Sequence, residues 1–325
     1  MKALQFVGDA AAQVTEVEVP RIAEDEILVA ARSVGICHSD IDLLEGRYII
    51  PFEYPVTPGH EWAGEIVAVG GAVHSFAAGD RVVGECVIGS DHFGFSVNGA
   101  AAEYFVVRPE WLHRIPDSMS WTQAALVEPF SCGYYASVRA DNLDASDTVV
   151  VFGAGPIGLG VVAGAAARHA RVLILDPNKS RAGLAMELGA DTHIDPNSET
   201  FLAEVLDATG GRGADVVIEA SGKPVAMAAA LDVAGFRARV VNVGIDVGGQ
   251  APARLGLIQS KELQIRGIIG SPGVWPQTLR FLDRTGIDLS PIITSTVPLA
   301  DAERAIDLVR NDRSQVKVHL VAEAR

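Results

Sequence analysis

The sequence predicts an α/β protein with two domains: a mostly β domain, then a doubly wound parallel sheet, with a C-terminal segment that returns to the first domain. Its 325 residues are about twice the usual length of one domain. Short β-branched runs separated by Gly and Pro fill the first part of the chain. From about Thr148 onward, apolar strands alternate with helical patterns, which is typical of a parallel sheet covered by helices.

The first domain is expected at residues 1–138. Its strand-like runs are EILVAARSVG, GEIVAVGGAV, DRVVGECV and AEYFVV. Runs of this length at short spacing, with turn residues between them, indicate a barrel-like or sandwich domain.

The second domain is expected at residues 139–269. Its strands are VVVF after Thr148, RVLILD, THID, ADVVIEAS, RVVNVGI and ELQIRGII, with helical patterns between them. Residues 270–325 continue with a helix at 276–284, a strand at 291–297, a helix at 301–309 and a strand at 317–322. That segment is too short to fold alone, so we expect it to pack on the first domain.

Charge and cysteine content exclude several classes of protein. Lys and Arg total 26 against 41 Asp and Glu, so the formal charge is 26 − 41 = −15, and no basic cluster exists to bind nucleic acid or an anionic membrane. Residues 149–167 carry no charge over 19 positions, but their glycines and Pro156 predict a buried strand, turn and helix instead of a membrane span. Three scattered cysteines and the absence of a signal-like N-terminus predict a soluble, cytoplasmic protein.

A glycine motif after the strand at 148–152 predicts a dinucleotide site. Gly153, Gly155 and Gly158 form G-x-G-x-x-G and open a helix, with phosphates expected at the helix N-terminus. Asp176 ends the next strand, 23 residues after Gly153, where an acid can bind the ribose hydroxyls of NAD. Alternatively, Asp176 is an ordinary acid at the end of a strand, and Arg181 could reach the additional phosphate of NADP.

Four residues with metal-binding side chains predict a catalytic zinc site. Cys37, His60 and Glu61 lie in two glycine-flanked turns, and Glu128 lies in LVEPF. One thiolate, one imidazole and one carboxylate are a typical ligand set for catalytic zinc, which keeps a fourth position open. Taken singly, the cysteine is equally consistent with core packing, the histidine with a buried hydrogen bond, and Glu128 with a helix-start acid.

These segments resemble the zinc-dependent medium-chain dehydrogenases, and within them the group similar to sorbitol dehydrogenase. The resemblance covers nearly all of the chain and is carried by GICHSDIDLLEG, PGHEWAGEIVAVG, AGDRVVG, AALVEPFSCG, VVVFGAGPIGLG, VVNVGI and RGIIGSPGVWP. It implies a Rossmann domain and a GroES-like catalytic domain. It also implies that Cys37, His60 and Glu128 hold the zinc and that Glu61 is a fourth or alternating ligand.

For the cofactor, the resemblance implies three groups of contacts. They are Pro156 and Ile157 at the pyrophosphate turn, Asp176 and Arg181 at the adenosine ribose, and Val243, Gly244, Ile245, Ile268, Ile269 and Gly270 along the nicotinamide.

The chain departs from the family pattern at two places. The segment between Asp80 and Tyr104 is short and holds only Cys86, so we expect no second, structural zinc. The proton relay of the family implies a role for Ser39, which is retained, but Asp42 stands where the family often has histidine.

The expected activity is hydride transfer between NAD and a secondary alcohol of a polyol, sugar or cyclitol, with small molecules as partners and a homo-oligomer (dimer or tetramer) as the assembly. Polar and aromatic residues expected near the substrate are Asp42, Glu45, Arg47, Tyr48, His92, Phe93, Phe95, Asn98 and Trp275, although loop exposure and core packing explain them equally well. Alternatives are an amino-alcohol (threonine-like) or simple alcohol dehydrogenase, a zinc-free quinone or enone reductase that uses NADPH, and a non-catalytic nucleotide-binding protein.

Overall fold

The computed structural model describes residues 1–141 and 143–322. The chain divides into two compact units: unit 1 comprises Met1–Glu128, Trp275–Arg284 and Ile293–Arg325, and unit 2 comprises Pro129–Val274 and Thr285–Ile292. Residues 129–138, which the sequence assigns to the first domain, thus belong to unit 2. The physical reason is close helix packing, since a Cβ at Gly133 would lie only 3.0 Å from the backbone nitrogen of Val161.

Unit 1 is built on a mixed sheet in the order β16-β17-β3-β4-β5-β9, with β8 also pairing with β3. The strands of this sheet are β3 (Ile27–Ile36), β4 (Glu61–Val69), β5 (Arg81–Gly84), β8 (Tyr104–Val107), β9 (Leu112–Arg114), β16 (Ile293–Pro298) and β17 (Lys317–Val321). Two further pairs form separate two-stranded sheets, β1 (Lys2–Phe6) with β2 (Ala12–Glu16) and β6 (Val87–Ile88) with β7 (Asp91–His92). The helices of unit 1 are α1 (His38–Leu44), α2 (Trp121–Ala125), α9 (Trp275–Thr285) and α10 (Ala302–Asn311), with short 3-10 turns at Pro109–Trp111 and Leu299–Asp301. The C-terminal strand β17 runs antiparallel to β3, so residues distant in sequence are neighbours in this sheet.

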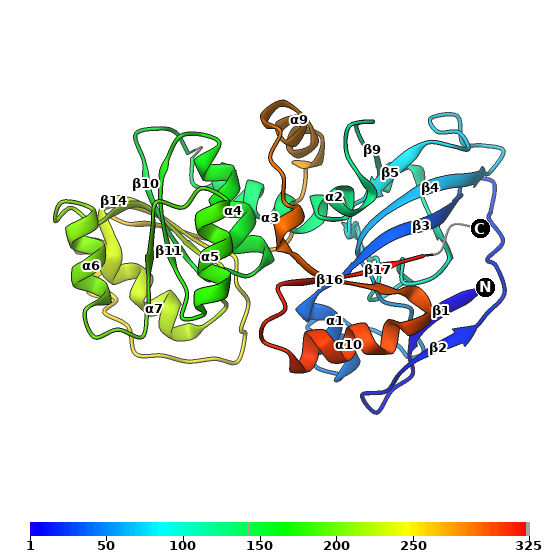
Figure 1. Ribbon diagram of the computed structural model, residues 1–325, viewed down its shortest axis with the longest axis horizontal. Helices are drawn as coiled ribbons and strands as arrows, with labels where there is room; N and C mark the ends of the chain where they lie inside the picture. The colour runs from blue at the N-terminus through cyan, green and yellow to red at the C-terminus, as the bar shows by residue number, and fades with distance from the viewer. Residues whose placement is uncertain (142, 323–325) are drawn as a thin grey trace. The chain divides into compact units, whose positions relative to one another are not determined.

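Unit 2 is a parallel sheet in the order β12-β11-β10-β13-β14-β15. Its strands are β10 (Thr148–Phe152), β11 (Arg171–Leu175), β12 (Thr192–Ile194), β13 (Ala214–Glu219), β14 (Ala234–Asn242) and β15 (Gln264–Gly267). Its helices are α3 (Val127–Arg139), which begins in unit 1, α4 (Pro156–Ala166), α5 (Lys179–Glu187), α6 (Phe201–Ala208), α7 (Pro224–Val233) and α8 (Gly256–Ser260), with a 3-10 turn at Ser290–Ile292. Figure 1 shows α4 and α5 on one face of the sheet and α6 and α7 on the other. This is the Rossmann strand order. The chain adds strands toward one edge from β10 to β12, and then adds β13 to β15 toward the other edge, starting next to β10.

Each unit has its own apolar core. In unit 1, Trp62, Phe93, Phe105 and Trp111 pack as an aromatic cluster within a larger set of buried residues. In unit 2, β10 is buried along its whole length, as expected for a central strand covered on both faces.

The charge-free stretch at 149–167 forms β10, a glycine turn and α4, so the predicted strand and helix are confirmed. Within the described residues, none of the helices combines the length and the apolar character that a membrane crossing requires.

Candidate functional site

The metal centre of unit 1 begins where β3 ends and α1 starts. Cys37 is the N-cap of α1, and Asp40 accepts a hydrogen bond from the Cys37 N–H at 2.8 Å. The short polar segment after β3 therefore forms a helix start, which fixes the backbone that carries the Cys37 thiol.

His60 and Glu61 lie beside Cys37 because of the register between β3 and β4. In this antiparallel pair, Gly35 lies opposite Glu61. A Cβ at Gly35 would lie 2.3 Å from Oε2 of Glu61, so any other residue there would displace this carboxylate. The neighbouring Gly59 has a φ of +99°, a left-handed conformation that glycine adopts easily, and the chain turns there before His60.

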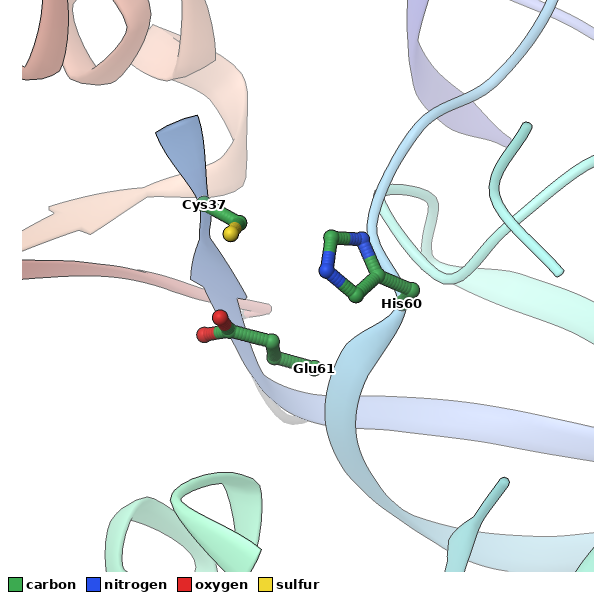
Figure 2. A group of neighbouring side chains, drawn as sticks. All are labelled: Cys37, His60 and Glu61. Atoms are coloured by element: carbon green, nitrogen blue, oxygen red, sulfur yellow. The ribbon is translucent and has the colours of Figure 1, made fainter. Parts of the chain in front are cut away.

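The ligand atoms of Cys37, His60 and Glu61 all lie within 4.8 Å of one another. Figure 2 shows the His60 ring facing the sulfur of Cys37 and the carboxylate of Glu61. His60 and Glu61 are buried, and Cys37 is half-buried. Sulfur, nitrogen and oxygen donors gathered in this way fit the ligand set of a catalytic zinc ion.

Asp40 is a functional residue that the sequence analysis did not identify. Its side chain has no solvent exposure, and its Oδ1 lies 3.4 Å from Nδ1 of His60. Burial lowers the pKa of His60, but the nearby charge of Asp40 outweighs burial, and the pKa is raised well above its ordinary value. Asp40 thus lies next to His60 and caps the helix that begins at Cys37, the place that a carboxylate behind a metal-bound histidine takes. Its position three residues after Cys37, in a capping box, was the available signal.

Lys317 is the second residue that the sequence analysis missed. It lies on β17 with a side chain that is 1% exposed, and its Nζ donates to both carboxylate oxygens of Glu61, at 2.7 and 2.6 Å. Burial opposes its charge, yet Glu61 and the other nearby anions raise the pKa of Lys317 overall. No local pattern in the sequence reveals this pair, since 256 positions separate its members.

Glu128 is not part of the group of residues whose ligand atoms all lie within 4.8 Å of one another. It is the second residue of α3, and burial raises the pKa of its carboxyl to about 7. His60 and Lys317 oppose that shift and Glu61 adds to it, so the Glu128 carboxyl is within electrostatic reach of the cluster.

The two residues of the predicted proton relay both lie on α1. Ser39 is half-buried and follows Cys37 by two positions. Asp42 accepts a hydrogen bond from Arg47 at 3.0 Å, with 35% of its side chain exposed.

The aromatic residues expected near the substrate divide into two groups. Tyr48 stacks on Phe95 with ring centroids 4.1 Å apart, and Phe95 lies 4.7 Å from the His60 ring, so this pair adjoins the metal centre. Phe93 packs in the core, and Trp275 is buried and stacks on His113.

The polar residues expected near the substrate form hydrogen bonds and ion pairs with other residues of unit 1. Asn98 accepts a hydrogen bond from the Thr57 N–H at 2.9 Å, and Glu45 pairs with Arg47 and Arg310.

The other two cysteines also have defined surroundings. Cys132 is buried in α3, as core packing predicts. Burial raises the pKa of Cys86 to about 12, with smaller contributions from His60, Glu128, Asp40 and Cys37, so this thiol is close to the metal centre. None of the three cysteines forms a disulfide bond.

The glycine motif of unit 2 forms the turn between β10 and α4. Gly153 has a φ of +94°, Gly155 caps α4, and Pro156 and Ile157 occupy its first turn. A Cβ at Gly158 would lie 1.9 Å from the carbonyl oxygen of Gly153, whereas a Cβ at Gly155 would meet no heavy atom within 4 Å. The turn is therefore closely packed at Gly158 and open at Gly155, as a backbone approach to a pyrophosphate requires.

Asp176 follows β11 beside this turn and is 7% exposed. Its Oδ2 accepts a hydrogen bond from the Ala154 N–H and its Oδ1 one from the Asn178 N–H, both at 2.7 Å. Arg181 lies in the first turn of α5, three residues after Asn178.

The remaining predicted cofactor residues follow the carboxyl ends of β14 and β15. They are Val243, Gly244, Ile245, Ile268, Ile269 and Gly270. Because the strands are parallel, these residues lie at the same edge of the sheet as the glycine turn.

Glu219, at the carboxyl end of β13, was also missed. Its buried carboxylate accepts hydrogen bonds from the N–H groups of Ser221 and Gly222 at 2.7 and 3.1 Å, which orders the turn next to Gly153. Its place at the end of a predicted strand, in ADVVIEAS, was the available signal.

Comparisons with known proteins cover both units. The alcohol dehydrogenase GroES-like domain matches residues 23–117, and the zinc-binding dehydrogenase family matches residues 156–284. Sorbitol dehydrogenase of Bacillus subtilis (strain 168) is 32% identical over 330 residues, which cover 94% of this chain and 93% of that protein.

Two solved structures are similar over the whole chain. The 2R,3R-butanediol dehydrogenase from Bacillus subtilis has a TM-score of 0.91 at 29% identity and covers 98% of this chain and 99% of its own. A zinc-binding dehydrogenase from Sinorhizobium meliloti 1021, bound to NADP, has a TM-score of 0.91 at 26% identity and covers 98% of each chain. With matches to both domains and a relative of 32% identity across 94% of its length, the chain belongs to the zinc-dependent medium-chain dehydrogenases, in the group that resembles polyol dehydrogenases.

Proposed function

We propose that this protein transfers a hydride between a secondary alcohol of a polyol, sugar or cyclitol and NAD, with one zinc ion per chain. Membership of the family implies zinc and a nicotinamide cofactor. The observation that carries the proposal is the buried sulfur, nitrogen and oxygen cluster of Cys37, His60 and Glu61. A zinc-free quinone or enone reductase has no use for such a cluster.

The donor set fits zinc, with Cys37, His60 and Glu128 as the ligands that would hold it and Glu61 as a fourth or alternating ligand. The Glu128 carboxyl adds a negative charge to the cluster when ionised, and Asp40 orients the His60 ring. Zinc there would supply the Lewis acidity that lowers the pKa of a substrate hydroxyl, and the nicotinamide would accept the hydride.

The residues of this chain bind the substrate and move its proton. Ser39 takes the hydroxyl proton at Oγ while its own proton leaves along α1, with Asp42 one turn further as the next acceptor. The Tyr48–Phe95 stack beside His60 gives the substrate an apolar wall, on which the C–H groups of a polyol can lie.

For the cofactor, the proposal of NAD rests on Asp176, whose carboxylate stands beside the glycine turn. A carboxylate there binds ribose hydroxyls and repels a 2′-phosphate. The alternative is a preference for NADP, which is favoured by the structural neighbour bound to NADP and by the nearby Arg181.

The name of the sorbitol dehydrogenase relative supports a polyol substrate, and the name of the butanediol dehydrogenase supports a secondary alcohol. Three cysteines that form no disulfide bond fit a cytoplasmic location. A homo-oligomer is supported by large apolar side chains exposed on unit 2, among them Val225, Phe236 and Leu255.

The test measures NADH formation by purified protein with a panel of polyols, sugars, cyclitols, threonine and simple secondary alcohols. Activity should be greatest with a polyhydroxylated substrate, disappear when zinc is removed by a chelator, and return when zinc is restored. Full activity in zinc-free protein, or reduction of quinones with NADPH, would show that the proposed function is wrong.

A further inference from the structure

Glu219 is a fully buried acid at the carboxyl end of β13 with no assigned role in the proposed reaction. Its Oε1 accepts hydrogen bonds from the N–H and Oγ–H of Ser221 and from the N–H of Gly222, and its Oε2 accepts a longer one from the Gly222 N–H at 3.3 Å. These donors are neutral, and burial raises the pKa of the carboxyl although the hydrogen bonds oppose that shift. The turn after β13 is therefore folded around the Glu219 carboxyl group.

The backbone of Glu219 also holds the end of β14, the next strand of the sheet. Its carbonyl oxygen accepts hydrogen bonds from the N–H groups of Val243 and Gly244, at 2.8 and 3.0 Å. Val243 and Gly244 belong to the segment that is expected along the nicotinamide. One residue thus binds two segments at the carboxyl edge of the sheet, the turn after β13 through its carboxyl group and the end of β14 through its carbonyl group.

These two segments touch each other without a side chain between them. A Cβ at Gly244 would lie 2.1 Å from the backbone nitrogen of Gly222 and 2.8 Å from Oε2 of Glu219. A Cβ at Gly222 would lie 3.2 Å from the backbone nitrogen of Ile245. Gly222 has a φ of +68°, a conformation that glycine adopts easily. Because the backbones are in direct contact, a displacement of the Glu219 carboxyl group shifts both segments.

The place of these segments in the sheet assigns them to one half of the cofactor site. A doubly wound sheet consists of two mononucleotide-binding halves and binds a dinucleotide across the point where the strand order reverses. Strands β10 to β12 form the half next to Asp176, where the adenosine ribose is expected, and β13 to β15 form the other half. Glu219 ends the first strand of that second half. The nicotinamide half of the cofactor is therefore the part that its two segments would meet.

A purely structural explanation of Glu219 is weaker than a role at the cofactor site. The short side chains of Ser, Thr, Asn and Asp commonly close turns by hydrogen bonds to nearby backbone. A longer, fully buried carboxyl group bound by neutral donors costs free energy instead. That cost is explained if the backbone that Glu219 fixes must keep one conformation in order to bind a ligand.

We propose that Glu219 is a positioning residue that fixes the backbone of Gly222 and Gly244 for the nicotinamide half of the cofactor. The inference rests on the proposed function, since it assumes that the chain binds a nicotinamide dinucleotide. Glu219 acts through these two backbone segments and transfers neither the hydride nor a proton.

The decisive variant is Glu219→Met, which keeps the approximate length of the side chain and removes both acceptor oxygens. The N–H groups of Ser221 and Gly222 then lose their acceptor, so the dissociation constant for NADH should rise by about tenfold or more. The dissociation constant for AMP, which is the adenosine half of the dinucleotide, should stay within about twofold of the wild type. Isothermal titration calorimetry measures both constants independently of activity.

Asp215→Ala is the matched control for damage to the fold. Asp215 lies near the opposite end of the same strand, and its Oδ2 accepts a hydrogen bond from the Thr148 N–H at 2.8 Å. This variant also removes a carboxylate from a backbone N–H, but at the amino edge of the sheet. It should lower the melting temperature and leave the dissociation constants for NADH and AMP unchanged.

Glu219→Gln keeps the proposal testable if Glu219→Met does not fold. Glutamine has the same shape and keeps one oxygen as an acceptor, but its hydrogen bonds are weaker because the charge is absent. NADH binding should weaken by about threefold, less than in Glu219→Met, and AMP binding should not change. Unchanged NADH binding, or equal weakening of NADH and AMP binding, would overturn the proposal.

The outcomes distinguish the role of Glu219 from the proposed function. If the wild type binds neither NADH nor NADPH, the proposed function fails. If the wild type binds NADPH in preference to NADH, the same comparison is made with NADPH. If the wild type binds the dinucleotide, but Glu219→Met binds it equally well or loses AMP binding to the same extent, only the role of Glu219 is overturned.

Discussion

Single carboxylates determine how the metal centre of this protein is held. Asp40 is buried, caps α1 at the Cys37 N–H and lies next to Nδ1 of His60. Glu61 is bound on both oxygens by Lys317, and burial raises the pKa of the Glu128 carboxyl to about 7. Asp40, Glu61 and Glu128 therefore have different surroundings, and we expect them to have different roles.

Replacement of Glu128 by alanine tests its role as a ligand. We expect most bound zinc and most activity to be lost, because two protein ligands hold zinc poorly. If Glu128 only favours the start of α3, its removal costs about 0.3–1 kcal/mol of stability. Zinc content by elemental analysis and the free energy of unfolding distinguish the cases, and full zinc content with normal turnover would contradict the prediction.

Asp176→Ala tests the choice of cofactor. The variant should bind NAD more weakly and discriminate less against NADP, because the carboxylate that accepts ribose hydroxyls and repels phosphate is gone. Ratios of kcat/KM for NAD and NADP measure this. Arg181→Ala is the matched variant, and it should lower any residual use of NADP. A wild type that prefers NADP would contradict the assignment.

His319 should make the protein sensitive to acid. It is buried on β17, its Nδ1 is 2.9 Å from Oγ of Ser33, and burial, together with the charge of Lys317, lowers its pKa to about 3. The unfolded chain binds a proton at a pKa of about 6.5. Between these values the unfolded state holds more protons, so stability falls as the pH falls.

The expected loss attributable to His319 is about 1–2 kcal/mol between pH 8 and about pH 5. His319→Asn should reduce this pH dependence, even if the variant is less stable at neutral pH. His74→Asn, at an exposed position, is the control and should retain the dependence of the wild type. Denaturant unfolding at several pH values measures the effect, and identical pH profiles for wild type and His319→Asn would contradict it.

At the scale of elements, one strand pairing and one turn place the predicted site residues. The register of β3 against β4 brings Cys37 next to His60 and Glu61, and the turn from β10 to α4 presents glycine backbone at the carboxyl edge of the parallel sheet. In the β3–β4 pair and in the β10–α4 turn, a glycine provides space that a side chain would fill. The space at Gly35 holds a carboxylate, and the space at Gly155 is open.

Two alanine variants of the glycine turn should therefore behave differently. Gly158→Ala places a Cβ against the backbone of Gly153 and should destabilise the protein by about 1–3 kcal/mol. Gly155→Ala meets no atom in the protein, so the melting temperature should hardly change, but the methyl group should obstruct the pyrophosphate and weaken NADH binding. Thermal unfolding and NADH titration test both, and normal NADH binding by Gly155→Ala would contradict the assignment of this turn.

At the scale of the whole molecule, the metal centre of unit 1 depends on both ends of the chain. Cys37, His60 and Glu61 come from positions 37–61, whereas Lys317 comes from a strand that joins the same sheet 256 positions after Glu61. Loss of the C-terminal strands would thus remove the partner of Glu61 as well as part of the sheet.

One zinc ion per chain is the prediction at this scale. Among residues 1–141 and 143–322, Cys37, His60 and Glu61 form the one group of three or more His, Cys, Asp or Glu side chains that is compact enough to hold a metal ion. Elemental analysis of purified protein should give about one zinc per chain, and Cys37→Ser should reduce it toward zero. Two tightly bound zinc ions per chain would contradict the prediction that the structural zinc of the family is missing.

The sequence by itself determined the features that depend on neighbouring residues. Alternation of apolar strands with helical patterns predicted the parallel sheet, and G-x-G-x-x-G with Asp176 predicted the turn that the structure shows. Hydrophobic periodicity and glycine conformation act over a few residues, so they can be read along the chain.

Only the tertiary structure decided which side chains surround the predicted ligands. It brought Cys37, His60 and Glu61 together, left Glu128 outside that group, and placed Asp40, Lys317 and Cys86 close to it. It also assigned Phe93 and Trp275 to packing and set Tyr48 beside the centre. The physical reason is that burial and strand register are properties of contacts between distant segments, and a lysine that looks like a surface residue in KVHLVA becomes a buried partner only when β17 pairs with β3.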